Sequence, residues 1–298
     1  MKKEYTDIKD IVFLNSNSKN KDDYYKLFNE GLFSDQGKWN NYKLYNKIDG
    51  MGNDIDSRLR NRMSDLSLGV YNVLENGPGK DIQEDNEFCL FTGFGEIETT
   101  DKILKNIIID KYSHVSPTLF HNSVHHTSLG YYTIIKKIHN PCMTISDGLK
   151  TNLSFINYIK LRIQLNKVMI IVGGDESSSF FNLDKNNPLT IVPSYVAYKI
   201  LPKSDKGFSF GGIVDNFEDL INLDSFKKSK YIFADKDTFI KLKEKIADKE
   251  IITEYPIVQD NPCGVIFRLA FPFYFNIKGL SLVVDKVNDK IFYFEVLL

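Results

Sequence analysis

The stretch from residue 116 to residue 179 decides the fold, and it reads SPTLFHNSVHHTSLGYYTIIKKIHNPCMTISDGLKTNLSFINYIKLRIQLNKVMIIVGGDESSS. Asn122 and Ser123 are residue types that cap helices. The apolar face of the predicted helix follows them at helical spacing: Val124, Leu129, Tyr132 and Ile135. This pattern predicts a helix that begins at residues 122–123.

The second part of the stretch alternates between strands and a helix. A short apolar run at 141–146 predicts a strand, and the Asp147-Gly148 turn ends it. Apolar residues at helical spacing then predict a helix over 149–163. Residues 167–172 predict a strand that Gly173-Gly174 would stop. A continuous apolar strand between helices is typical of a parallel sheet that is buried on both faces.

The rest of the chain repeats this alternation. Upstream, the pattern predicts strands over 11–14 and 88–94, and helices over 22–29, 57–75 (capped by Ser57) and 100–109 (with Ile103, Ile107 and Ile108 inward). Downstream, it predicts strands over 189–201, 207–214, 231–234, 251–258, 280–284 and 291–296, and helices over 217–223, 237–247 and 264–275. The chain is therefore predicted to be an α/β protein. Its two βαβαβ-type halves, 1–204 and a shortened 205–298, would form one compact unit.

Bulk composition bounds the possible partners and the compartment. The chain has 298 residues and a formal net charge of −1, so no charge excess predicts binding to nucleic acid or to an anionic membrane. No apolar run approaches the roughly 20 residues that span a bilayer, and no signal-peptide core is visible. The three cysteines (Cys89, Cys142 and Cys263) are expected to be buried, reduced thiols. A cytoplasmic location is the expectation.

Three segments carry a family resemblance: RNRMSDLSLGVYNVL (60–74), FTGFGEIETTDKIL (91–104), and NSVHHTSLGYYTI (122–134) with the later TIS strand and VGGDE. Over residues 57–179 the chain resembles β-ketoacyl synthases, which are condensing enzymes of the thiolase fold. It is most similar to divergent members with an SVHN-type helix and no conventional active site. The resemblance implies two pseudo-symmetric halves in an α-β-α-β-α layered sandwich.

The resemblance also implies where a nucleophile should be. The family places a catalytic cysteine in the first turn of the helix after the TIS strand, where the helix dipole favours a thiolate. Counted from Ser146, that position is Leu149, which has no nucleophilic atom. Cys142 lies in the preceding strand, seven residues earlier, and is expected to be unreactive.

The histidines that the family uses are absent from the second half. Condensing enzymes polarise the thioester carbonyl with two histidines in turns of that half. Here those turns read FADKDT (233–238) and DNPCG (260–264), and all five histidines precede residue 140. His125 and His126 could act as a base or a ligand, but they are adjacent and diverge on a helix. They are expected to be helix residues of a subunit interface.

Other motifs indicate no cofactor. VGGDESS (172–178) lacks the spacing and the lysine of a phosphate loop, and Gly93-Phe-Gly95 lacks the third glycine of a dinucleotide fingerprint. Asp147 is expected to cap a helix. No metal site is predicted, and the lysines Lys227, Lys228 and Lys230 are expected to be solvated surface.

Three functions remain open. In the first, the chain is an inactive ketosynthase-like subunit that pairs with an active ketosynthase and shapes acyl-chain elongation, as chain-length factors do in polyketide, aryl-polyene and fatty-acyl systems. An acyl carrier protein would be a further partner. In the second, it is an acyltransferase or hydrolase that uses Ser123, Ser146 or His126. In the third, it is a homodimeric binding or scaffold protein. Residues expected at a partner interface or acyl tunnel are Asn122, Val124, His125, Leu129, Tyr132, Met143 and Leu149.

Overall fold

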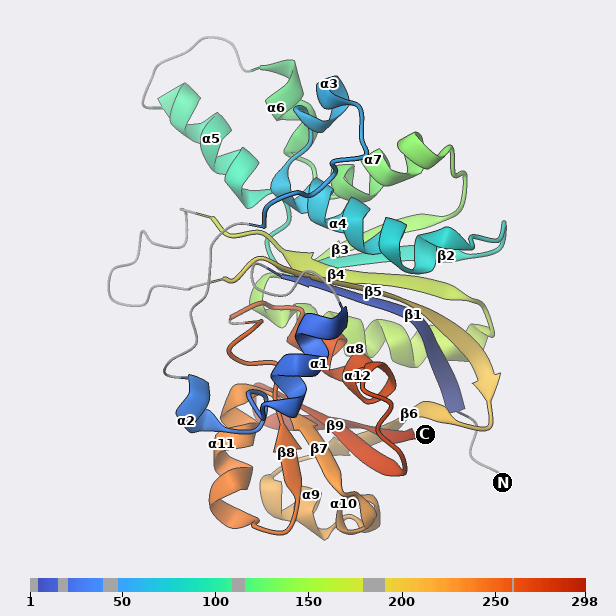
Figure 1. Ribbon diagram of the computed structural model, residues 1–298, viewed down its shortest axis with the longest axis vertical. Coiled ribbons are helices and arrows are strands. Elements are labelled where there is room, and N and C mark those ends of the chain that lie inside the picture. Colours follow the sequence, from blue (N-terminus) through green and yellow to red (C-terminus); the bar gives the residue numbers. More distant parts are fainter. Residues whose placement is uncertain (1–4, 16–20, 40–47, 109–115, 179–190, 259) are drawn as a thin grey trace.

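A computed structural model of the chain describes residues 5–15, 21–39, 48–108, 116–178, 191–258 and 260–298 (Figure 1). The strands of the first half are β1 (Tyr5–Asn15), β2 (Glu87–Thr92), β3 (Cys142–Ser146), β4 (Met169–Asp175) and β5 (Ser194–Ser204). Its α-helices are α1 (Lys21–Asn29), α2 (Gln36–Trp39), α3 (Ser57–Arg60), α4 (Asp65–Asn76), α5 (Ile97–Ile108), α6 (Pro117–Asn122), α7 (Thr127–Lys136) and α8 (Thr151–Arg162). Its 3-10 turns are η1 (Pro78–Lys80), η2 (Gly148–Lys150) and η3 (Ile163–Leu165).

The second half is built from fewer elements. Its strands are β6 (Gly207–Val214), β7 (Tyr231–Ala234), β8 (Glu250–Ile252), β9 (Leu280–Val287) and β10 (Lys290–Leu297). Its helices are α9 (Phe217–Asn222), α10 (Asp224–Lys228), α11 (Lys236–Lys245) and α12 (Gly264–Tyr274). Between its second and third strands it has α11, where the first half has α5, α6 and α7. The second half is therefore shortened, as predicted.

The two halves have the same strand topology. In the first, β2 pairs in parallel with β3 and β4, and the β4–β5 and β5–β1 pairs are antiparallel. In the second, β7 pairs in parallel with β8 and β9, and the β9–β10 and β10–β6 pairs are antiparallel. The strand orders β3-β2-β4-β5-β1 and β8-β7-β9-β10-β6 correspond strand by strand. The predicted duplication is confirmed, and we propose the turn between Ser204 and Gly207 as the junction of the halves.

The halves stack in five layers (Figure 1). Helices α4 to α7 cover the outer face of the first sheet, and α9 to α11 cover the outer face of the second. Helices α8 and α12 lie between the sheets. The sequence of α12, GVIFRLAFPFY, is apolar around almost its whole circumference, and ten of its eleven residues are buried. A helix that is apolar on all sides is stable only when protein surrounds it.

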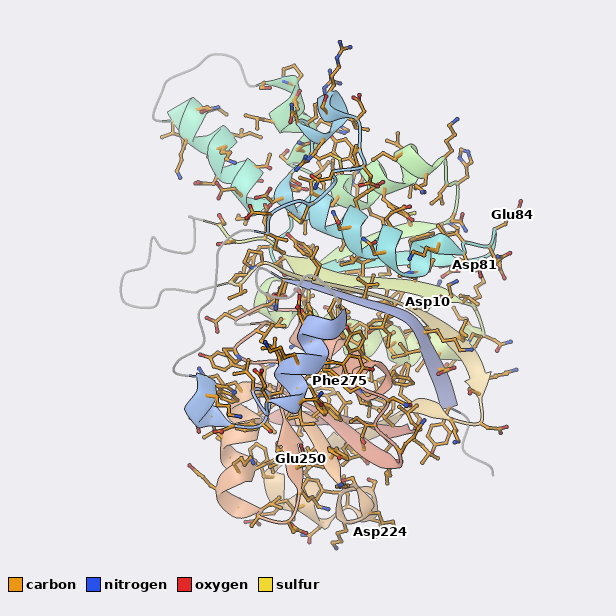
Figure 2. The ribbon with its side chains drawn as sticks, in the orientation of Figure 1. Asp10, Asp81, Glu84, Asp224, Glu250 and Phe275 are labelled. Carbon is orange, nitrogen blue, oxygen red and sulfur yellow. The ribbon has the colours of Figure 1, made fainter. Side chains whose placement is uncertain are left out.

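Aromatic rings fill the middle layer and fix α1 in it. Phe13 of β1 stacks on Phe267 and meets Tyr274 edge to face, with ring centroids 5.9 and 4.7 Å apart. Phe28 of α1 stacks on Phe275 at 4.2 Å. Figure 2 labels Phe275 beside α1. Among the described residues of the polar N-terminal region, Tyr24 and Phe33 belong to the core between the sheets, and Tyr25 and Phe28 pack against it.

Two predicted helices differ from the helices in the structure. The helix expected over 57–75 breaks after α3, because the chain forms a separate N-terminal cap for each part. The Asp56 carboxylate caps α3 by accepting a hydrogen bond from the Arg58 N–H, and the Ser64 hydroxyl caps α4 by accepting one from the Ser67 N–H. The helix expected to begin at Asn122 and Ser123 is also wrong. Those residues end α6, and α7 begins at Thr127.

Two predicted strand ends are also wrong. Gly173 and Gly174 do not stop β4, which continues to Asp175 because the glycines pair with Val196 and Tyr195 of β5. A Cβ atom at Gly174 would lie 2.5 Å from the Ser194 carbonyl oxygen, so only glycine fits there. The strand expected over 251–258 is only β8, and a cis Tyr255–Pro256 peptide follows it. The expected strand over 189–201 begins outside the described residues, and β5 starts at Ser194.

Some side chains expected inside the protein lie on its surface. Ile107 and Ile108 at the end of α5 are exposed, whereas Ile103 is buried. Cys142 is exposed, because β3 is the outermost strand of the first sheet, while Cys89 and Cys263 are buried. Within the described ranges, no helix has the length and apolar character needed to cross a membrane.

Candidate functional site

The turn between β3 and α8 presents Leu149 on a fixed support. Gly148 has a φ of 54°, a conformation that favours glycine, and its N–H donates to the Gly93 carbonyl at 2.8 Å. The Ser146 hydroxyl donates to the same carbonyl at 2.9 Å. The Leu149 side chain is 65% exposed. The backbone is thus held at the end of the first sheet, while the side chain at the expected nucleophile position is accessible.

Leu149 lines a pocket of about 410 Å³ together with both turns in which the family resemblance places histidines. Asp235, Lys236 and Asp237 come from the first turn, and Asp260, Asn261 and Pro262 come from the second. The remaining lining residues are Asn152, Glu254, Tyr255, Val258 and Arg268. The structure therefore brings the three expected positions together, and none of the described residues that line the pocket is a cysteine or a histidine.

A buried ionic cluster closes the inner side of this pocket. The Arg268 guanidinium of α12 forms ion pairs with the carboxylates of Glu254 and Asp285. Burial raises the pKa of Asp285 to about 7 against the attraction of Arg268, and burial also raises the pKa of Glu254. One guanidinium cannot balance two buried carboxylates, so the cluster retains a proton near neutral pH. The pocket is polar and carries several carboxyl groups, which makes it a poor container for an acyl chain.

Cys263 lies next to the pocket but cannot replace the missing nucleophile. It is fully buried at the start of α12, with Sγ 3.2 Å from the Phe91 carbonyl oxygen and 3.7 Å from Asp175 Oδ2. Burial, and then the negative charge of Asp175, raise the pKa of this thiol well above its usual range. A thiol that stays protonated and inaccessible is not a nucleophile.

Asp175 is the residue that ties the turns around the pocket together. Its carboxylate accepts from the Thr92 hydroxyl at 2.6 Å and from the N–H groups of Gly93 and Phe94 at 2.8 and 2.9 Å. Burial raises its pKa to about 6 although these hydrogen bonds oppose the shift. Sequence reasoning assigned VGGDE to a turn after a strand, so it missed the role of this carboxylate.

A second pair of buried carboxyl groups lies beneath α4. Glu96 Oε1 accepts hydrogen bonds from the hydroxyls of Ser128 at 2.6 Å and Ser64 at 2.7 Å. Glu176 Oε2 accepts from the Leu66 N–H at 3.0 Å. Burial raises the pKa of both carboxyls, and the charge of Glu96 raises that of Glu176 further. The pair connects the end of β4 to α4, α5 and α7, and the sequence pattern did not indicate it.

The candidate residues of α6 and α7 have different environments. Leu129 and Tyr132 are buried in the core between α7 and the first sheet. Asn122 is also buried, and its Oδ1 accepts a hydrogen bond from the Tyr131 hydroxyl at 2.9 Å. Val124, His125 and His126 are exposed, and His125 lies against the Gly95 turn. His114 lies outside the described residues. Among the described residues, no histidine lines the pocket that contains Leu149.

Met143 belongs to an edge of the first sheet. The strand β3 pairs with β2 on one side, and no described strand pairs with its other side. Met143 is 47% exposed there, and the sheet edge is continuous with a small hollow lined by Cys142, Tyr158 and Arg162. An unpaired strand edge offers its free N–H and C=O groups to another chain.

Comparisons with known proteins agree with this architecture. Residues 52–198 match the family described as the β-ketoacyl synthase N-terminal domain. No curated protein sequence matches the chain.

Many solved structures share the fold, and three of them illustrate the match at low sequence identity. A structure of a ketosynthase (ApeO) in complex with its chain length factor (ApeC) from Xenorhabdus doucetiae aligns with a TM-score of 0.60 at 14% identity, covering 98% of this chain and 99% of that chain. The ishigamide ketosynthase/chain length factor aligns with a TM-score of 0.73 at 11% identity, covering 99% of this chain and 100% of that chain. A type II polyketide synthase acyl-carrier protein in complex with its ketosynthase aligns at 0.70 and 11% identity, covering 100% of both chains.

Proposed function

Because the chain is a divergent β-ketoacyl synthase-like protein of the thiolase fold, we propose that it is a catalytically silent subunit that pairs with an active ketosynthase. In this role it would shape acyl-chain elongation in a polyketide, aryl-polyene or fatty-acyl pathway. The other members of the assembly would be the ketosynthase and an acyl carrier protein. The proposed compartment is the cytoplasm, which fits the free thiols of Cys89 and Cys263.

The composition of the pocket around Leu149 is the observation that carries the proposal. Condensation requires a thiolate that accepts the acyl group and donors that stabilise the developing oxyanion. Leu149 cannot form a covalent bond to an acyl group, and the facing turns contribute three carboxyl groups, those of Asp235, Asp237 and Asp260, beside a single ammonium group, that of Lys236. These carboxylates would repel the anionic intermediates of a decarboxylating condensation.

The edge of β3 is the proposed contact with the partner. Its unpaired side can extend the first sheet into a second chain, and Met143 is available to pack across the junction. Exposed apolar side chains of α6 and the following turn, Phe120 and Val124, lie in the same part of the sequence as the expected interface. Acyl tunnel walls would then come from both subunits, and the polar pocket around Leu149 would stay outside the tunnel.

The proposal predicts no acyl-enzyme from the isolated protein. Incubation with malonyl and long-chain acyl thioesters, followed by intact-mass measurement, should show the unmodified mass. The variant Leu149→Cys tests whether the pocket admits a thioester, since position 149 is exposed in the turn η2 that precedes α8. We expect this variant to show no decarboxylation of a malonyl thioester, because none of the described residues that line the pocket is a histidine. A malonyl or acyl adduct on the unmodified chain would contradict the proposal.

The proposal also predicts that a charge on β3 disrupts assembly. A ketosynthase encoded in the same genome, co-expressed with the chain, should copurify as a 1:1 complex. Met143→Glu should reduce the recovered partner at least about tenfold, because the interface would bury an unpaired carboxylate. The matched control is Ile213→Glu, since Ile213 on β6 is 48% exposed and Met143 is 47% exposed.

The outcome separates the other candidate functions. If the chain forms a homodimer that Met143→Glu dissociates and no ketosynthase copurifies, a homodimeric binding protein is favoured. If a serine-directed probe labels the chain and Ser146→Ala abolishes the label, an altered hydrolase is favoured. In the structure the Ser146 hydroxyl donates to a backbone carbonyl, a contact that does not activate it.

A further inference from the structure

A groove of about 520 Å³ lies on the second half, at the opposite end of α11 from the pocket around Leu149. Lys236 at the start of α11 lines the pocket, and Lys245 at its end lines the groove. A ten-residue helix is about 15 Å long, so the two sites are separate. Figure 2 labels Asp224 and Glu250, which begin the neighbouring elements α10 and β8.

The groove combines an apolar floor with a basic rim. The floor is formed by Ile221, Phe226, Ile246 and Ala247. The rim is formed by Lys227, Lys245 and Lys249, and Asp248 is the one acidic side chain among the described residues that line the groove. The sequence pattern predicted that lysines of this region are ordinary solvated surface. Lys227, Lys228 and Lys230 are exposed, as that prediction has them, and Lys227 also lines the groove with Lys245 and Lys249.

Lys249 is a cation that the protein has already oriented. Its Nζ donates to the carbonyl oxygens of Lys227 at 3.1 Å and Ser229 at 2.6 Å, and it lies 5.5 Å from the centre of the Phe226 ring. An ammonium group has three N–H donors, so two of them hold the side chain and the third remains for a ligand. Because the two carbonyls fix its orientation, binding an anion would cost little additional side-chain entropy.

We propose that this groove binds an anionic amphiphile of the medium-chain carboxylate type, with the carboxylate at Lys249 and the alkyl chain over Phe226 and Ile246. The volume lies within the range of about 300–1,000 Å³ that is usual for small-ligand sites. The charge of the rim selects an anion over a cation of the same shape. The inference does not depend on the pairing with a ketosynthase.

The test is calorimetric titration of the full chain with sodium decanoate below its micellar concentration at low ionic strength. Decanoate should bind 1:1 and at least about tenfold more tightly than decyltrimethylammonium. Across hexanoate, octanoate and decanoate, affinity should rise roughly two- to fourfold for each added methylene. Equal binding of the cationic and anionic amphiphiles would overturn the proposal, because it would indicate a detergent effect without charge recognition.

Variants locate the site. Lys249→Met should weaken decanoate binding severalfold, and the triple variant Lys227→Met/Lys245→Met/Lys249→Met should weaken it at least about tenfold. The control Lys26→Met removes the same charge from an exposed position on α1 and should bind decanoate as the unmodified chain does. Urea unfolding curves verify that each variant is folded. Unchanged affinity in the triple variant would refute the site.

An acidic segment of another protein is the competing occupant. A capped Glu-Leu-Leu-Glu tetrapeptide offers two carboxylates and apolar side chains without an alkyl chain. Binding of this peptide together with no binding of decanoate would overturn the amphiphile proposal in favour of a protein partner. Because the experiment uses the isolated chain and lysines remote from β3, its failure would leave the ketosynthase pairing unaffected.

Discussion

Replacing Arg268 with methionine is expected to lower the free energy of unfolding by about 3–5 kcal/mol, which is the usual cost of removing one partner from a buried ion pair. The substitution keeps the volume of the side chain but leaves the carboxyl groups of Glu254 and Asp285 buried in the middle layer without a counter-charge. Urea unfolding followed by circular dichroism at pH 7.5 measures the change. Because the cluster closes the inner side of the pocket, the variant should also lose the pocket's shape.

Two further variants separate the loss of charge balance from the loss of packing. The triple variant Arg268→Met/Glu254→Gln/Asp285→Asn removes all three ionisable groups of the cluster, so it should recover most of the stability lost in the single variant. Arg162→Met is the matched control. Arg162 is partly exposed, and its partner Glu87 would still form an ion pair with Lys167, whose Nζ lies 2.8 Å from Glu87 Oε1. The Arg162→Met substitution should lower the free energy of unfolding by about 1 kcal/mol or less. A loss below 1 kcal/mol for Arg268→Met would show that the ion pairs are not needed for stability.

The residues around the pocket could be named from the sequence because the family resemblance implied the positions, and local order fixed which residue of this chain occupies each one. A strand, the Asp147-Gly148 turn and a helix follow one another in one continuous stretch, and Leu149 has a fixed place in it. The facing turns, 233–238 and 260–264, likewise follow or precede recognisable elements. Residues of both turns line one pocket with Leu149.

The contacts that stabilise the pocket could not be predicted, because they join residues distant in the sequence. Asp175 and Cys263 are separated by 88 residues, and Glu176 and Leu66 by 110. The spacing of apolar residues does not indicate which distant residues come into contact. Each acidic residue, considered alone, is equally typical of a turn or of a helix cap. The break between α3 and α4 was missed for a related reason. Apolar residues continue at helical spacing through Met63, so the pattern does not record the new cap at Ser64.

The stability of the protein is expected to fall as the pH rises from about 5 to 7.5. Burial raises the pKa of Asp175 to about 6 from 3.8, and it raises the pKa of Glu176 well above 4.5. Above pH 4–5 these groups ionise in the unfolded chain while they stay protonated in the folded one. The folded state then binds more protons, and each such proton lowers the free energy of unfolding by about 1.4 kcal/mol per pH unit. The stabilising contribution is complete below the unfolded pKa values and is lost as the pH rises through the folded ones.

The variant Glu176→Gln assigns part of this slope to one carboxyl group. Glu176 faces Glu96 and Glu98 from the α5 region and Asp65 from α4, all acidic, with the Leu66 N–H as its hydrogen-bond donor. A neutral amide removes the cost of burying a charge among them while its oxygen can still accept from Leu66. The variant should therefore be more stable than the unmodified chain at pH 7.5 and about equally stable at pH 4.5, with a flatter profile between. Glu218→Gln on the exposed side of α9 should leave the profile unchanged, and a steeper profile for Glu176→Gln would contradict the assignment.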